Sequence, residues 1–221
     1  LRRRQRQMCI RDRNDGKQIG SFMDKVKANS QNYPVGVSEY GFGGSIYQHR
    51  CPVNESEILL GRLHPEEFQT ISHEKNWEAL AGRSYLWAKF IWVFADFQSV
   101  IRKEGDRDGI NDKGLVTYDR QIKKDAFYFY KANWNTEPML HLCDSRFTER
   151  FYSITSIKAY TNLEAAILYV NGKKIGKMKR DKYNRVIWNN ILLQPGENII
   201  RIDAKNGKKI ISESCVWTLK L

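Results

Sequence analysis

The 221-residue sequence contains little cysteine, histidine or proline and has no long apolar run. Its longest apolar stretch, residues 86–97, is interrupted by Lys89 and Asp96 and is far shorter than the roughly 20 apolar residues that cross a bilayer. The four cysteines are widely scattered, which argues against a disulfide framework, and neither they nor the four histidines have zinc-ligand spacing. We therefore expect no membrane span, no metal site and no cofactor.

Positive charge is abundant, but it is concentrated in two short blocks. Residues 1–13 hold six arginines against one aspartate, and residues 171–185 hold seven basic residues against Asp181. These blocks contribute +5 and +6 of the net +12, so the remaining +1 leaves the rest of the chain close to neutral. We predict that residues 1–17 form a disordered tail, with a non-native origin as an open alternative, and that the second block is a solvated hairpin. Nucleic acid is therefore not the expected partner.

Helices and strands are expected to alternate over residues 18–136. Apolar spacing predicts an amphipathic helix over 20–30. The compact apolar run 34–41 predicts a buried parallel strand, and a second buried strand is predicted over 85–97. A proline and two glutamates start a predicted helix over 64–82, and an aromatic helix is predicted over 125–134. This alternation indicates an α/β unit with parallel strands.

Short strands replace this pattern after a boundary near residues 135–139. Five β-rich segments are separated by the turn dipeptides Asn171-Gly172, Pro195-Gly196 and Asn206-Gly207. The predicted strands cover 152–160, 165–170, 186–193, 199–204 and 210–219. Regular short strands with such turns predict a β-sandwich over residues 138–221.

Glu39 is the leading candidate for a catalytic residue. It ends a predicted buried strand and precedes a glycine-rich loop, which is where parallel α/β barrels carry their catalytic groups. From position alone, a loop acid or a helix cap is an equally good interpretation.

Three motifs in order resemble the retaining exo-β-glycosidases of glycoside hydrolase family 2, which include β-galactosidases and β-glucuronidases. Residues 35–46, VGVSEYGFGGSI, resemble that family's nucleophile strand and loop, and residues 90–97, FIWVFADF, resemble its eighth barrel strand. Residues 109–120 and 124–134 resemble its closing loop and last helix. The resemblance implies that residues 18–136 are the C-terminal portion of a (β/α)8 barrel, strands 7 and 8, and that 138–221 are an immunoglobulin-like sandwich.

The same resemblance implies roles for four side chains. Glu39 corresponds to the nucleophile, and Trp92 to a platform for the apolar face of the sugar. Asn111 and Lys113 form an Asn-x-Lys pair that in β-glucuronidases binds the substrate carboxylate, where a lysine ammonium suits a single anionic group. The family's acid/base glutamate follows an asparagine on an earlier strand. Asn54-Glu55 follows the nucleophile in a polar loop, so we expect the acid/base to be absent and the fragment to be inactive alone.

The expected substrate is a terminal β-D-galactoside, because the long loop 101–108 and the sandwich favour that class. A β-glucuronide is the alternative, favoured by Asn111, Lys113 and Ala95-Asp96-Phe97. A non-catalytic carbohydrate-binding or interaction module is the other alternative, since Trp188 and Trp217 could line a glycan groove. The expected partner is a carbohydrate, with a homo-oligomer left open. The resemblance alone favours a periplasmic or secreted bacterial protein.

Overall fold

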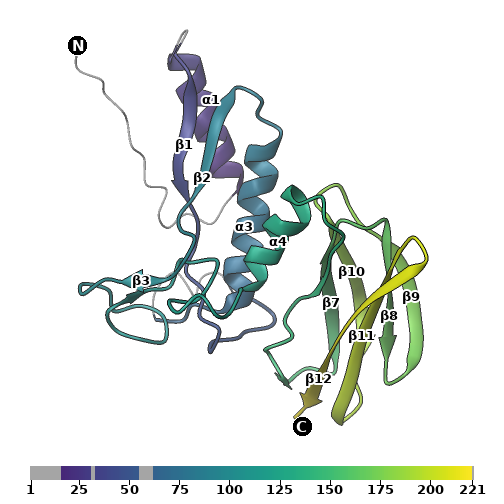
Figure 1. Ribbon diagram of the computed structural model, residues 1–221. Helices are drawn as coiled ribbons and strands as arrows, with labels where there is room; N and C mark the ends of the chain where they lie inside the picture. The colour runs from purple at the N-terminus through teal and green to yellow at the C-terminus, as the bar shows by residue number, and fades with distance from the viewer. Residues whose placement is uncertain (1–15, 31–32, 55–61, 221) are drawn as a thin grey trace. The chain divides into compact units, whose positions relative to one another are not determined.

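The computed structural model describes residues 16–30, 33–54 and 62–220 (Figure 1). It is mostly β structure with few helices, arranged in two compact units, Leu1–Ala126 and Phe127–Leu221. The predicted tail, residues 1–17, lies almost wholly outside the described residues. No helix among those described is long and apolar enough to cross a membrane.

The first unit is built around one parallel strand pair and its connecting helix. Strand β1, Val35–Tyr40, pairs with β2, Leu86–Ile91, so that Val35 lies opposite Leu86 and Tyr40 lies opposite Ile91. Helix α3, Glu66–Ala81, connects the two strands, and α1, Gly16–Asn29, packs beside it (Figure 1). Parallel strands need such a crossover, so the predicted α/β alternation is confirmed for this unit.

Local sequence sets both ends of α3. Pro65 directly precedes the helix with φ near −61°, and Glu66 and Glu67 occupy the first turn, beside the positive end of the helix dipole. At the other end, the Gly82 N–H donates to the carbonyl oxygen of Leu80. The predicted helix over 64–82 is thereby confirmed.

The prediction of a long buried strand over 85–97 is wrong in two respects. Strand β2 ends at Ile91, and Trp87 and Phe90 are 68% and 55% exposed. Side chains project from the faces of a sheet, so the exposure means that these two rings are not covered by elements packed on the faces of the β1–β2 pair among the described residues. A second two-stranded pair follows, in which β3, Phe97–Gln98, runs antiparallel to β4, Ile110–Asn111.

The second unit, here called the β-rich unit (residues 127–221), is a sandwich of two sheets. One sheet has the order β10-β7-β5 and the other the order β6-β12-β11-β8-β9. The strands are β5 Leu140–Leu142, β6 Glu149–Arg150, β7 Ile154–Thr161, β8 Ala165–Val170, β9 Lys173–Lys179, β10 Arg185–Leu192, β11 Gly196–Asn206 and β12 Lys209–Leu219. All five predicted strands are present, and the basic block 171–185 contains the whole of an additional, largely exposed strand, β9, which forms a hairpin with β8 across the turn at Asn171-Gly172.

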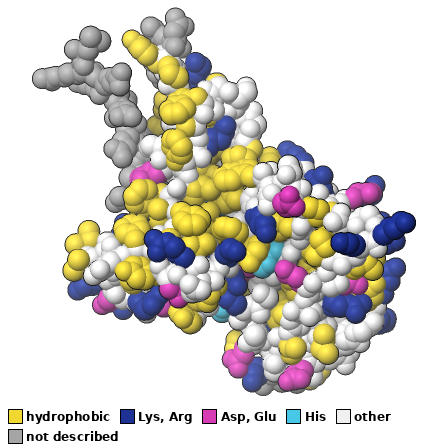
Figure 2. Space-filling model, in the orientation of Figure 1, with side chains coloured by type: hydrophobic (Ala, Val, Ile, Leu, Met, Phe, Trp, Pro, Cys, Tyr) yellow, Lys and Arg dark blue, Asp and Glu magenta, His cyan; other side chains and the backbone are white. Residues whose placement is uncertain are grey.

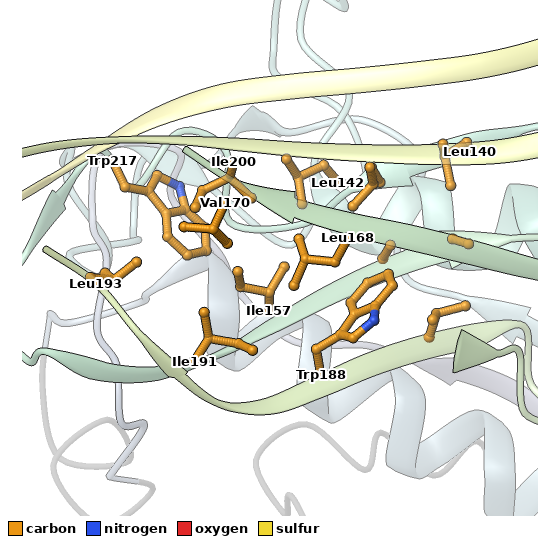
Figure 3. Close-up of a cluster of buried hydrophobic side chains, with 14 of the residues drawn as sticks. Leu140, Leu142, Ile157, Leu168, Val170, Trp188, Ile191, Leu193, Ile200 and Trp217 are labelled. Atoms are coloured by element: carbon orange, nitrogen blue, oxygen red, sulfur yellow. The ribbon is translucent and has the colours of Figure 1, made fainter. Parts of the chain in front are cut away.

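Apolar side chains from both sheets form the core of the sandwich (Figure 3). Leu168 and Ile200 come from the larger sheet and Ile157 from the smaller one, and each is fully buried. Trp188 and Trp217 lie in the same core, with 5% and 0% of their surfaces exposed. Both tryptophans are therefore core residues and line no glycan groove.

Helix α4, Asp125–Trp134, crosses the division between the units. The ring of Tyr128 stacks on His141 at 3.6 Å between centroids, and Phe129 lies 5.4 Å from Tyr160. Through these aromatic contacts, the part of the helix from Phe127 onward packs against the sheets of the β-rich unit. The spatial division consequently falls at Ala126/Phe127, earlier in the chain than the change in sequence pattern at 135–139.

Candidate active site

Glu39 lies at the carboxyl end of β1, one residue before the strand ends. It is 9% exposed, and Val37 and Tyr40 on the same strand are also buried. Gly41 follows the strand, and a Cβ atom at this position would lie 2.2 Å from the carbonyl oxygen of Trp92. Only glycine permits this approach of the two strand ends.

Trp92 directly follows β2 and is joined to the end of β1. Its backbone N–H donates to the carbonyl oxygen of Tyr40 at 2.8 Å. The side chain is 38% exposed, and its ring meets the edge of Phe97 at 5.9 Å between centroids. The exposed indole is available to a ligand at this end of the strand pair.

The segment with Asn111 and Lys113 runs alongside the residues that follow Trp92. The N–H of Val93 donates to the Lys113 carbonyl at 3.1 Å, and the N–H of Leu115 donates back to Val93 at 3.0 Å. The Asn111 side-chain oxygen accepts from the Lys113 N–H at 3.1 Å. Asn111 and Lys113 are 3% and 5% exposed, unlike ordinary loop residues. Backbone hydrogen bonds thus link the segments that carry all four candidate residues.

A buried hydrogen-bonded pair that the sequence pattern did not predict supports these loops. Nδ1 of His64 lies 2.8 and 3.0 Å from the two carboxylate oxygens of Asp112, between Asn111 and Lys113. Gly43 and Gly105 pack so closely on this pair that a Cβ at either would fall within 2.5 Å of it. The glycines in both loops are the sequence signal for this close packing.

Lys124 connects three segments around the candidate site. It is 1% exposed, and its Nζ donates to the Gly44 carbonyl at 2.6 Å, to Asp96 at 2.8 Å and to the Asp112 carbonyl at 2.9 Å. Burial raises the pKa of Asp96, and the positive charge of Lys124 opposes that shift. The acid at position 96, which interrupts an apolar run, was the signal that could have revealed this pair.

His73 contributes no positive charge to the site. Burial, aided by the charge of Lys124, lowers its pKa to about 3. Its imidazole is therefore neutral at physiological pH and packs 6.2 Å from the ring of Tyr40.

No cluster of three or more His, Cys, Asp or Glu side chains suited to a metal ion occurs within the described ranges. The acids of loop 101–108 are engaged by arginines, with Asp106 3.2 Å from Arg107 and Asp108 paired with Arg62. Glu55, the acid of the rejected Asn-Glu pair, lies outside the described residues.

Two parts of the chain's length are matched by known proteins: residues 153–211 by a family model and about nine tenths of the chain by a homologous enzyme. Residues 153–211 match a family described as a domain of unknown function, DUF4982. A β-glucuronidase of Bacteroides fragilis is 43% identical over 201 residues, which are 90% of this chain and 29% of that protein.

Solved structures resemble the chain over nearly its whole length. An FMN-binding β-glucuronidase from Faecalibacterium prausnitzii L2-6 superposes with a TM-score of 0.82 at 31% identity, covering 93% of this chain and 30% of that one. A Bacteroides fragilis structure provisionally assigned as a β-galactosidase gives a TM-score of 0.86 at 26% identity, covering 93% and 31%. The chain therefore spans less than one third of each of these relatives and matches their C-terminal region.

Proposed function

Because this chain is homologous to β-glucuronidases and β-galactosidases of the glycoside hydrolase family 2 type, we propose that it is part of a retaining exo-β-glycosidase. The observation that carries the proposal is Glu39, a largely buried carboxylate at the carboxyl end of a parallel strand. In this proposal residues 18–136 are strands 7 and 8 of a (β/α)8 barrel, with their helices, and residues 138–221 are an immunoglobulin-like domain. The parallel β1–α3–β2 unit and the two stacked sheets are consistent with those assignments.

Glu39 acts as the nucleophile in a double displacement. One of its oxygens forms a bond to the anomeric carbon while the glycosidic C–O bond breaks and an acid/base carboxyl protonates the leaving oxygen. The same acid/base then takes a proton from water, which displaces Glu39 and restores the original anomeric configuration. The partner carboxyl must stand about 5–5.5 Å away, and the family resemblance assigns it to an earlier barrel strand.

Three further residues bind the sugar in this proposal. Trp92, partly exposed at the end of β2, stacks on the apolar face of the ring. Asn111 and Lys113 supply an amide and an ammonium group from a buried loop held by His64 and Lys124. The electrostatic attraction between a buried ammonium group and an anion is larger in the low dielectric of the protein interior than in water. A sugar that carries a carboxylate is therefore a suitable ligand.

The preferred substrate is therefore a terminal β-D-glucuronide. The Asn111-x-Lys113 pair supports this choice, as does the 43% identity to a protein named β-glucuronidase. A β-D-galactoside, favoured by the sequence analysis, remains the second candidate because of the loop 101–108 and the high structural similarity to the provisional β-galactosidase.

A chimera tests both parts of the proposal. The chain replaces the homologous segment of the Bacteroides fragilis β-glucuronidase, and the product is assayed on aryl β-glucuronide and aryl β-galactoside. We expect glucuronide turnover that Glu39→Gln lowers by at least about a thousandfold, as the loss of an essential catalytic group does. A mechanism-based glycosyl inhibitor should label the peptide that contains Glu39, and Glu74→Gln, on α3, serves as the matched control.

The same chimera separates the two substrates. Lys113→Met should reduce glucuronide turnover by about a hundredfold or more and leave galactoside turnover within a few-fold, because it removes the charge that pairs with the carboxylate. Equal losses on both substrates would contradict the carboxylate assignment, and labelling at any residue other than Glu39 would overturn the nucleophile.

A further inference from the structure

The outward face of the larger sheet carries a band of cations that the glycosidase proposal does not use. Each residue of β8 on this face has a lysine directly opposite on β9: Lys174 faces Tyr169, Lys177 faces Ile167 and Lys179 faces Ala165. The neighbouring inward residues, Leu168 among them, belong to the core. The pleat of the sheet thus directs all three lysines to the same exposed surface.

This band continues from the sheet edge toward its centre. On β11, Arg201 lies opposite Tyr169, and its guanidinium packs 4.3 Å from the centre of the tyrosine ring. Asp203 on the same face forms an ion pair with Arg201 at 3.4 Å and accepts a hydrogen bond from Ser212 at 2.9 Å. A second acid, Glu197, is exposed further along β11. Figure 2 shows lysine and arginine side chains along the margin of the β-rich unit where β9 lies.

The lysines of the band are not neutralised within the protein. In the part of the chain that the structure describes, no ion pair engages Lys174 or Lys177, and Lys179 has only a long contact of 3.9 Å to the exposed Glu164. Beside Lys179, a depression of about 400 Å³ is lined by Glu164, Arg180, Asp181 and Lys182. Asp181 forms an ion pair with Arg185 at 2.7 Å. Its charge is thereby balanced, so the basic side chains make this end of the face cationic as well.

Lysine on an edge strand has a simpler use, which is to prevent pairing with another sheet. That use requires charge at the edge only. Here the cations extend across β8 to Arg201, two strands inward, with an aromatic ring between them. Neighbouring strands lie about 4.8 Å apart, so the band spans about 10 Å from β9 across β8 to β11. An extended polymer can lie along a surface of this width.

We propose that this face, from Lys174, Lys177 and Lys179 to Tyr169 and Arg201, binds a carboxylated polysaccharide. The lysine ammonium groups pair with successive carboxylates, and Arg201, which is paired with Asp203, packs on one side of the Tyr169 ring while the other side contacts an apolar sugar face. The choice of a carboxylated glycan rests on the proposed glucuronide function. The face would hold the polymer whose terminal residues are the substrate, and would do so without taking part in the reaction.

Binding by the 221-residue chain tests the proposal without any measurement of turnover. Calorimetric titration with hyaluronan, which carries glucuronate carboxylates, should show binding that weakens as NaCl is added, because surface charges are screened by salt. The neutral polymer dextran should not bind. Absence of hyaluronan binding at low salt would overturn the proposal and leave the glycosidase assignment untouched, since that assignment is tested by the chimera.

A matched pair of variants locates the site. Lys174→Gln/Lys177→Gln should weaken hyaluronan binding about tenfold or more, at roughly a factor of five for each lysine beside a polyanion. The control Lys158→Gln/Lys220→Gln removes the same charge from β7 and from the end of the chain, and should change the affinity less than about twofold. Both pairs keep the arginine-rich residues 1–13, so any contribution of that segment cancels.

Three results would overturn the assignment. Equal weakening by the two pairs would mean that net charge alone causes binding, and no weakening by the first pair would place the site elsewhere. Double-stranded DNA that competes as well as hyaluronan would replace the glycan with a general polyanion. Unchanged circular dichroism and unfolding midpoints establish that the variants fold.

Discussion

At the scale of single residues, Lys124 is the most instructive side chain in the first unit. Its ammonium satisfies one carboxylate and two carbonyl oxygens in a place that water does not reach. Sequence pattern alone favours a solvent-facing lysine in a polar segment. The buried partners come from segments 12 to 80 residues away in the chain, so only the tertiary structure brings them together.

We predict that Lys124→Met destabilises the first unit by about 3–5 kcal/mol at neutral pH, because it leaves the Asp96 carboxylate buried without its cation. Denaturant unfolding of the 221-residue chain measures this change. Lys123→Met, at the exposed neighbouring position, should change stability by less than about 0.5 kcal/mol. The double variant Lys124→Met/Asp96→Asn should recover most of the loss, since neither member of the pair then leaves an unpaired charge behind.

The pH dependence gives a second measure of the same pair. The folded-state pKa of Asp96 lies above the ordinary value of 3.8, so the folded state binds this proton more tightly than the unfolded state does. The resulting stabilisation is complete at pH values below the unfolded-state pKa and is lost as pH rises through the folded-state pKa. The deficit of Lys124→Met should therefore shrink as pH is lowered from neutral toward the raised pKa. A deficit that is constant over this range would show that charge burial is not its cause.

At the scale of secondary-structure elements, the candidate site depends on how closely the ends of β1 and β2 approach. Gly41 permits the hydrogen bond from Trp92 to Tyr40, which aligns the residue after one strand with the end of the other. Sequence pattern predicted both strands and the position of Glu39 at the end of one, but neither the length of β2 nor its exposure. Both depend on tertiary contacts: the strand's length on its pairing with β1, and its exposure on what packs against the faces of the sheet.

Gly41→Ala should destabilise the first unit by about 1–3 kcal/mol, because the added methyl group meets the Trp92 carbonyl oxygen at 2.2 Å and must displace backbone. Gly82→Ala is the matched control, since a Cβ there meets no atom within 4 Å, and it should be neutral or stabilising by up to about 1 kcal/mol. Urea midpoints compare the two. Similar midpoints for both variants would contradict the steric explanation.

At the scale of the whole molecule, the chain spans less than one third of its relatives, and the proposed chemistry needs two carboxylates. Barrels of this type need about 250 residues to close. We therefore predict that the purified 221-residue chain hydrolyses neither aryl glucuronide nor aryl galactoside, whereas the chimera is active. Turnover by the chain alone, abolished by Glu39→Gln, would contradict this prediction and require an acid/base within these residues.

The sequence by itself determined much of the local structure. Turn dipeptides, helix-start residues and the change from helical to β-rich pattern predicted α3, α4, the five main strands of the sandwich and the position of Glu39. These features depend on neighbours in the chain, such as the two-residue turn Asn171-Gly172, where both residues adopt positive φ.

Only the tertiary structure decided which distant groups meet. Contacts between segments far apart in sequence form the His64–Asp112 and Lys124–Asp96 pairs and bury Asn111 and Lys113. Strand pairing likewise places Lys174, Lys177 and Arg201 on one face of a sheet. Trp188 and Trp217 illustrate the same limit, since alternation fits either a core or a groove until the second sheet is in place. The physical reason is that burial and charge pairing depend on the packing of elements, whereas sequence pattern reports only the local conformation of each one.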